Sequence, residues 1–199
     1  MSGSLPTLVN PTTVAFHSIQ PTRISVAHSL KRQARTNSVQ KWALSFGYTV
    51  LNRATIMSFY GFLIGQRGQA DTFTTVLPGH TTPQGSWAGA PVVGAAAQTG
   101  TSIALTGFTA SQTGVAKAGD FLKFAGHTKV YMVTADANSS VSGTATLSIQ
   151  PALLQSPGAG ESITVSNVPF TVALASDNLD GNIQAGPIYS FNIDLVEVY

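Results

Sequence analysis

The sequence contains no cysteine and few charged residues. Without cysteine, the chain has no disulfide framework, no thiolate metal site and no cysteine nucleophile. Only 9% of the 199 residues are charged, compared with roughly 25% in an average globular chain. A surface with so few charges is either rich in Ser, Thr, Asn and Gln or largely buried against other subunits.

Long apolar runs are also missing. The first residues lack a basic segment followed by a continuous apolar one, so we expect no signal peptide. The longest apolar run is shorter than the roughly 20 residues that a bilayer requires, so we expect no membrane contact. A hydrophobic content of 43% nevertheless excludes a disordered chain.

The motifs of common enzymes and cofactor sites are absent as well. The four histidines have no metal-ligand spacing such as H-E-x-x-H, and no glycine pattern typical of nucleotide binding is present. Acidic pairs for hydrolysis are disfavoured because the chain has only eight carboxylates. We therefore expect no catalytic residues, no metal site and no cofactor, and no enzyme activity.

The charges that do occur are segregated along the chain. Seven basic residues and no acidic one precede Asp71, whereas all eight acidic residues lie from Asp71 onward. Such segregation is typical of a nucleic-acid surface or of subunits whose opposite charges meet. For the cluster Lys31, Arg32 and Arg35 we favour a solvated hairpin tip or a subunit contact. Nucleic-acid binding is disfavoured because no aromatic residue is interleaved with these charges.

Long alternating strands and one helix make up the outer parts of the chain. Residues 23–30 and 42–50 alternate with a period of two, and we expect them to pair as a long hairpin with its turn near 36–38. Apolar residues at helical spacing over 56–64 predict a short helix capped by Asn52. Further strands are expected at 71–78, 168–174 and 189–195. These segments predict a mainly β, discontinuous sandwich or barrel domain formed by residues 1–81 and 166–199.

A second β module is predicted between these parts. Residues 79–100 are rich in Gly, Ala, Pro and Thr and are expected to form a linker or a loosely held edge. Short strands follow at 102–108, 120–124, 129–134, 143–150 and 162–165, which fits a small β-barrel of the OB type over residues 82–165. Phe121, Phe124 and Tyr131 are candidates for barrel core or for ligand contact.

Two motifs in this arrangement resemble a known family. The first is W-x-L-S-F-x-Y-x-x-L at 42–51, followed by the helix, by Arg67-Gly68 and by D-T-F-x-x-x-L-P at 71–78. The second is A-G-D-F-x-K-x-x-x-H-x-K-V-Y at 118–131. Together they resemble the distal tail proteins of long-tailed (siphovirus) phages, of the phage T5 type with an inserted OB-like module.

The resemblance implies a structural protein of the phage tail tip. It implies a homo-oligomeric, hexameric ring that joins the tail tube protein to the baseplate hub and tail fibre proteins, in virions assembled in the host cytoplasm. The discontinuous domain would form the ring, and the module would point outward. The alternative function is a carbohydrate- or nucleic-acid-binding OB-type module, with a host surface glycan as a possible ligand.

Overall fold

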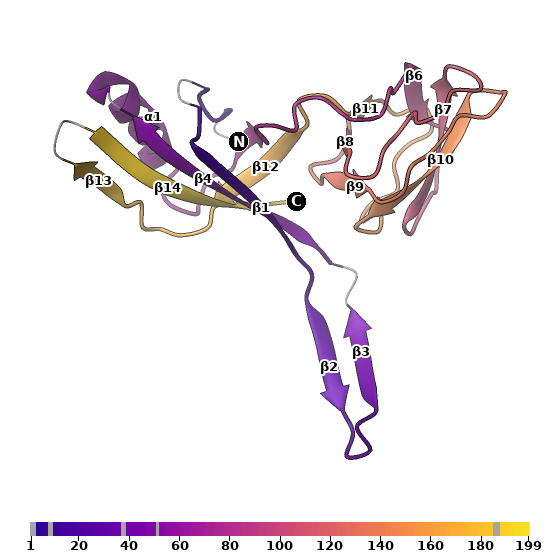
Figure 1. The fold of residues 1–199 in the computed structure, drawn as a ribbon, viewed down its shortest axis with the longest axis horizontal. Helices are drawn as coiled ribbons and strands as arrows, with labels where there is room; N and C mark the ends of the chain where they lie inside the picture. The colour runs from indigo at the N-terminus through magenta and orange to yellow at the C-terminus, as the bar shows by residue number, and fades with distance from the viewer. Residues whose placement is uncertain (1–2, 8–9, 37–38, 51, 185–187) are drawn as a thin grey trace. The chain divides into compact units, whose positions relative to one another are not determined.

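A computed structural model describes residues 3–7, 10–36, 39–50, 52–184 and 188–199. The fold is mainly β with a single helix in this part of the chain, as predicted (Figure 1). The chain divides into two compact units. Unit 1 comprises Met1–Ile19, Lys41–Pro78 and Pro169–Tyr199, and unit 2 comprises Gln20–Gln40 and Gly79–Val168.

Unit 1 is built on a six-stranded sheet in the order β1-β4-β14-β12-β5, with β13 beside β14. The pairings between these strands are antiparallel. The strand bounds are β1 Thr13–Ile19, β4 Lys41–Val50, β5 Phe73–Val76, β12 Pro169–Leu174, β13 Gly181–Gln184 and β14 Ile188–Glu197. The two longest strands, β4 and β14, pair with each other although they are far apart in sequence.

One face of this sheet carries the core of unit 1. Phe191 lies opposite Tyr48 in the register of β14 and β4, and their rings stack with centroids 4.9 Å apart. Helix α1, Arg53–Gly65, packs Phe59 against both rings, and the Asn52 side chain caps it by accepting a hydrogen bond from the Ala54 backbone. The predicted helix and its N-cap are confirmed.

The opposite face of β4 and β14 is polar. The Ser45 hydroxyl donates to Asp194 Oδ1 at 2.5 Å across the two strands. Gly47 lies between Thr13 and Asn192, and an added Cβ would come 2.8 Å from Asn192 Oδ1 and still closer to Thr13 Oγ1. A larger residue here would displace the Thr13 and Asn192 side chains, so glycine fits where three strands approach each other closely.

Most of unit 2 is a nearly closed six-stranded barrel in the order β11-β8-β9-β10-β7-β6. The strand bounds are β6 Gly89–Val93, β7 Ser102–Phe108, β8 Phe121–Phe124, β9 Tyr131–Val133, β10 Thr144–Gln150 and β11 Ile163–Thr164. A bridge between Val92 and Ser162 joins the two edges of the sheet. The predicted small barrel is confirmed, and its assignment to the OB type stays a prediction.

The remainder of unit 2 is a two-stranded ribbon of β2, Thr22–Val26, and β3, Arg32–Thr36. In Figure 1 no other strand runs beside these two. Every residue from Thr12 to Thr36 is exposed. We call residues 20–40, among which 37 and 38 lie outside the described residues, the arm.

One predicted strand pairing was wrong. Residues 23–30 do not pair with 42–50, because β2 pairs with β3 and turns at 27–31, while β4 pairs with β1 and β14. Of the turn predicted at 36–38, Thr36 is the end of β3 and the other two residues lie outside the described ones. The segment at 79–100 contains the barrel strand β6, whose Val93 is buried, because its small residues fit beside β7.

Two further strands were missed. The proline-containing N-terminal segment includes β1, which forms an edge of the unit 1 sheet. The segment before β14 includes β13, which begins at Gly181 and pairs with β14. Both are edge positions, where a strand needs a buried neighbour on one side only and its own pattern is correspondingly weak.

Candidate assembly surface

The base of the arm is held by the barrel through a buried lysine. Lys129, two residues before β9 in the connection from β8, is 2% exposed. Its ammonium donates to both the backbone oxygen and the side-chain Oε1 of Gln40, each at 2.8 Å. The two hydrogen bonds compensate for the loss of water around this buried charge, so they anchor the point where the arm rejoins the chain.

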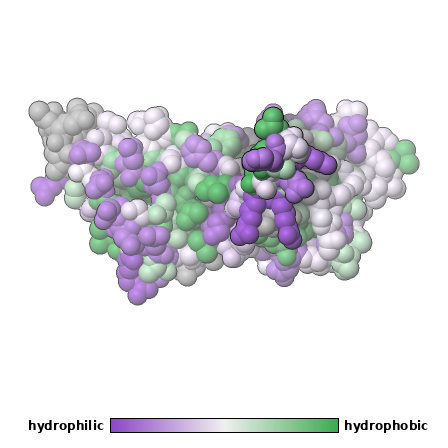
Figure 2. Space-filling view, turned by 90° about the horizontal axis from the view of Figure 1, so that it is seen from below, coloured by the Kyte–Doolittle hydropathy of each residue, from purple (hydrophilic) through white to green (hydrophobic). Residues whose placement is uncertain are grey.

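The ribbon of the arm has two chemically different faces. Residues directly opposite each other in an antiparallel pair lie on the same face. Ile24 lies opposite Ala34, and Val26 lies opposite Arg32, so one face is largely apolar. Figure 2 shows hydrophobic and hydrophilic side chains together on the ribbon. Ile24 and Val26 are 55% and 59% exposed, which leaves this apolar face uncovered.

The other face is basic. Arg23 lies directly opposite Arg35 in the register of the two strands. Like charges directly opposite each other destabilise a strand pair. The described residues place no carboxylate in ion-pair contact with either arginine. This face is therefore suited to a partner that supplies negative charge.

The predicted basic cluster is divided among three parts of the arm. Lys31 lies in the tip, Arg32 stands on the apolar face beside Val26, and Arg35 stands on the basic face. Sequence reasoning missed Arg23, the residue that completes the basic face. The signal was available in principle, because hairpin pairing of 22–26 with 32–36 places the two arginines opposite each other.

The tip of the arm contains a backbone conformation that is unusual for its residue type. Leu30 has a φ of 61° and is 84% exposed. Its backbone N–H donates to the Ala27 carbonyl at 2.8 Å, which closes the turn. Glycine or asparagine adopts this left-handed conformation more readily than leucine.

The aromatic residues of the barrel are buried. Phe121, Phe124 and Tyr131 are 4% exposed or less, and the last two belong to the barrel core. The other two aromatic residues of 79–168, Trp87 and Phe108, are also buried. None of these five rings is exposed for stacking on a sugar or a base, which is the contact that such ligands require.

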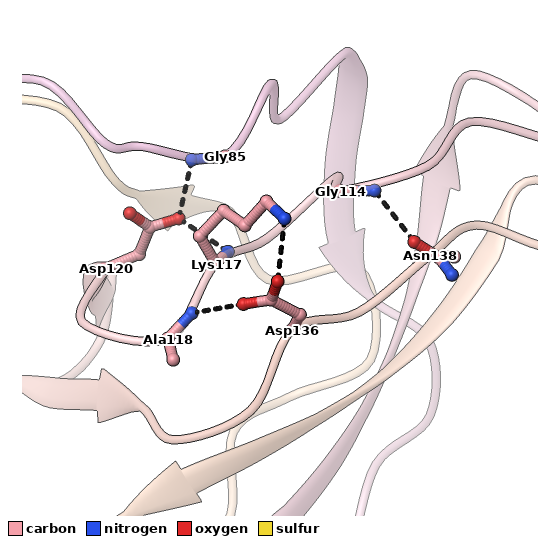
Figure 3. Close-up of polar contacts among 7 residues, drawn as sticks. All are labelled: Gly85, Gly114, Lys117, Ala118, Asp120, Asp136 and Asn138. Carbon is pink, nitrogen blue, oxygen red and sulfur yellow. Dashed lines mark hydrogen bonds and ion pairs between the residues drawn. The ribbon is translucent and has the colours of Figure 1, made fainter.

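A buried aspartate organises the loops at one end of the barrel (Figure 3). Asp120 is 2% exposed and accepts four hydrogen bonds. Oδ1 accepts from the Gln84 backbone at 2.6 Å, and Oδ2 accepts from the Gly85 backbone at 3.0 Å, the Lys117 backbone at 2.9 Å and Trp87 Nε1 at 2.9 Å. Asp120 thus joins the segment before β6 to the start of the β8–β9 hairpin, and its role is structural.

Two more carboxylates of the barrel are held within it. The Lys117 ammonium contacts Asp136 Oδ2 at 2.6 Å, and this hydrogen bond, with a second from the Ala118 backbone, lowers the pKa of Asp136 (Figure 3). Burial opposes a lower pKa at Glu161, but backbone donors at Gly126 and Gly158 together with the charge of His127 outweigh it. The barrel therefore satisfies these charges internally.

Sequence reasoning did not assign a role to Asp120. It stands next to an apolar strand in the stretch Gly119-Asp120-Phe121, and a lone acidic residue at such a position is a weak signal for a buried acceptor. Its four donors lie up to 36 residues away in sequence, so only the fold brings them together.

The structure shows no metal or membrane feature in the residues that it describes. No group of three or more His, Asp or Glu side chains in the described ranges could hold a metal ion. The helix in the same ranges does not have the length and apolar character needed to cross a bilayer.

Comparison with known proteins identifies the barrel. Residues 80–168 match the family described as the B domain of distal tail protein pb9. No curated protein matches the chain. The matched segment covers the whole barrel and belongs to this family, so the expected resemblance to phage distal tail proteins is confirmed.

Proposed function

We propose that this chain, a phage distal tail protein by its residues 80–168, assembles into a ring that joins the tail tube to the baseplate hub and fibres. The family match carries the proposal and gives the coarse role, a structural protein of the phage tail. The proposal includes the hexameric stoichiometry, the named neighbours, assembly in the host cytoplasm and the absence of catalysis.

The arm supports an assembly role independently of the family match. An exposed two-stranded ribbon with an uncovered apolar face is marginally stable by itself. Residues 12–36 are all exposed in the single chain, and this stretch includes Ile24, Val26 and Leu30. Apolar surface of this extent on a soluble chain is typical of a protein–protein contact.

The low charge content is consistent with the same role. Surfaces that become buried in an oligomer do not need charges for solubility, and interface cores are depleted in charged residues. The chain has only 18 charged residues in 199. Several of them, such as Asp120 and Lys129, are buried, so still fewer contribute to the surface.

The test is the state of the purified full-length chain. Sedimentation velocity and electron-microscopy class averages are expected to show closed rings with a knob for each inserted barrel. A chain that stays monomeric at high concentration, together with antibody labelling that places it away from the tail tip in virions, would contradict the proposal.

A carbohydrate- or nucleic-acid-binding role is not favoured by the barrel. All five aromatic rings of residues 79–168 are buried, so the ligand contacts expected of an OB-type module are not available on its surface.

A further inference from the structure

Four positive charges of the arm have no ion-pair partner among the residues that the structure describes. Arg23, Lys31, Arg32 and Arg35 make no ion pair with the described residues, whereas Arg67 pairs with Asp71 and Lys117 with Asp136. The arm also leaves its apolar face uncovered. Both observations point to a partner surface that is acidic and partly apolar.

Six of the eight carboxylates are already engaged by contacts within their own unit. Asp71 and Asp136 have basic partners. The other four accept backbone N–H groups: Asp120 and Glu161 in the barrel, and Asp177 from Gln69 and Glu197 from Trp42 in unit 1.

The two remaining carboxylates lie in one place. Asp180 makes no hydrogen bond or ion pair with the described residues, and Asp194 accepts only the Ser45 hydroxyl through its side chain. Both are exposed, and both line the same hollow of about 420 Å³ beside β14. This hollow is a built cavity in unit 1 rather than a group of acids on a flat surface.

The lining of the hollow is suited to guanidinium groups. Asn178, Asn182 and Asn192 provide amide oxygens beside the two carboxylates, and the half-buried Leu179 provides an apolar edge. A guanidinium presents several N–H donors in a plane, binds carboxylates through paired hydrogen bonds and packs its flat faces on apolar groups. We call this cavity the acidic hollow.

We propose that the arm of one copy docks on a second copy of this chain, with Arg23 and Arg35 entering the acidic hollow between Asp180 and Asp194. The inference rests on the proposed ring, and it names the contact that builds it. Carboxylates between the two opposed arginines convert a repulsive strand pair into a charge-compensated one. The apolar face of the arm is then free to cover apolar surface of the same neighbour.

Such a contact is head-to-tail. The arm and the acidic hollow are different surfaces, and each copy carries one of each, so repetition of the contact produces a ring when its rotation closes. This arrangement accounts for the segregation of charge along the sequence, in which basic residues precede Asp71 and acidic residues lie from Asp71 onward.

Charge reversal tests the contact in the full-length chain. Variant A carries Arg23→Glu and Arg35→Glu, and variant B carries Asp180→Lys and Asp194→Lys. We expect each variant alone to remain folded and to lose rings, with the apparent Kd of association raised at least tenfold. Arg53→Glu, a reversal on α1 outside the arm, is the matched control and should form rings like the unmodified chain.

Mixing the variants distinguishes a contact between copies from one within a copy. The acidic arm of A matches the basic hollow of B, and the basic arm of B matches the acidic hollow of A, so an equimolar mixture is expected to form alternating rings. If A or B alone forms rings normally, or if the mixture stays dissociated, the inference is overturned. If the unmodified chain itself forms no rings, the proposed function fails instead.

A milder variant covers the case in which B does not fold. Asp180→Asn removes an exposed charge that has no partner among the described residues, so the free energy of unfolding of this variant should equal that of the unmodified chain. We expect it to weaken ring association several-fold at low salt and to have a smaller effect at high salt, where such contacts are screened. Unchanged association at low salt would overturn the inference.

Discussion

The barrel and the arm belong to the same unit, yet they satisfy their polar and apolar groups in opposite ways. In the barrel, Asp120 accepts four internal hydrogen bonds and every aromatic ring is buried. In the arm, Arg23 faces Arg35 without a counter-ion and Ile24 lies in solvent. The barrel is therefore complete as a single copy, whereas the arm is completed only by a neighbour.

Removal of the buried carboxylate is the strongest way to break the barrel. Asp120→Ala leaves four N–H donors without their acceptor, and we expect the free energy of unfolding to fall by about 3–5 kcal/mol. Chemical denaturation of the chain, followed by tryptophan fluorescence, measures it. Asp136→Asn, which alters an exposed ion pair and keeps an oxygen for the Ala118 backbone donor, is the matched control and should have a much smaller effect. Equal losses in the two variants would contradict the structural role of Asp120.

Polar substitution of the arm should weaken ring association and leave the free energy of unfolding almost unchanged. Ile24→Asp with Val26→Asp changes two exposed side chains, so the unfolding free energy should hardly change. Burial of two such side chains at a contact contributes about 3 kcal/mol, so ring association should weaken by roughly a hundredfold. Sedimentation velocity over a concentration series measures this. A variant that unfolds more easily but still associates would contradict the assignment of the arm to a contact between copies.

A substitution at Leu30 distinguishes the stability of the arm's turn from the strength of ring association. Glycine accepts the φ of 61° at Leu30 with less strain than leucine, so Leu30→Gly should leave the turn formed or strengthen it by about 1 kcal/mol. Hydrogen exchange of the tip amides measures the turn. We expect ring association to weaken by several-fold because an 84% exposed side chain is lost, whereas Ser29→Gly should leave association unchanged. Unchanged association of Leu30→Gly would limit the contact to the ribbon faces.

The smallest expected effect is the acid sensitivity of the barrel. The pKa of Glu161 is lower than its ordinary value of 4.5 in the folded chain, so its contribution to stability is present above that value and is lost as pH falls through the folded pKa. Glu161→Gln should therefore flatten the fall of barrel stability below about pH 4.5. Thermal unfolding at pH 3, 4, 5 and 7 measures it. An unchanged pH dependence would show that Glu161 does not contribute.

Elements with a buried face could be predicted from the sequence. The alternation in 42–50 and 189–195 matches β4 and β14, whose side chains Tyr48 and Phe191 stack in the core. The helical spacing of Ile56, Phe59 and Leu63 matches the three buried residues of α1. In these segments the core imposes a period on the sequence, so the period reveals the element.

Strand pairing and the candidate contact could not be predicted in the same way. The arm has no core of its own, so nothing in the alternation of 23–30 distinguished a partner at 42–50 from the true partner at 32–36. The acidic hollow combines Asp180, which directly precedes β13, with Asp194 of β14, and neither residue belongs to a motif. Only the three-dimensional arrangement shows that these two carboxylates share a cavity.

Disulfide trapping tests most directly whether a second copy completes the arm. Because the chain has no cysteine, any disulfide must come from introduced residues, and Ser25→Cys on the basic face with Ser176→Cys at the acidic hollow places one thiol on each side of the contact. Mild oxidation of the rings should give disulfide-linked oligomers on a non-reducing gel, and each single variant should give none through this pair. Rings that form normally but yield no linkage, or only linkage within one chain, would contradict docking of the arm on a neighbouring copy.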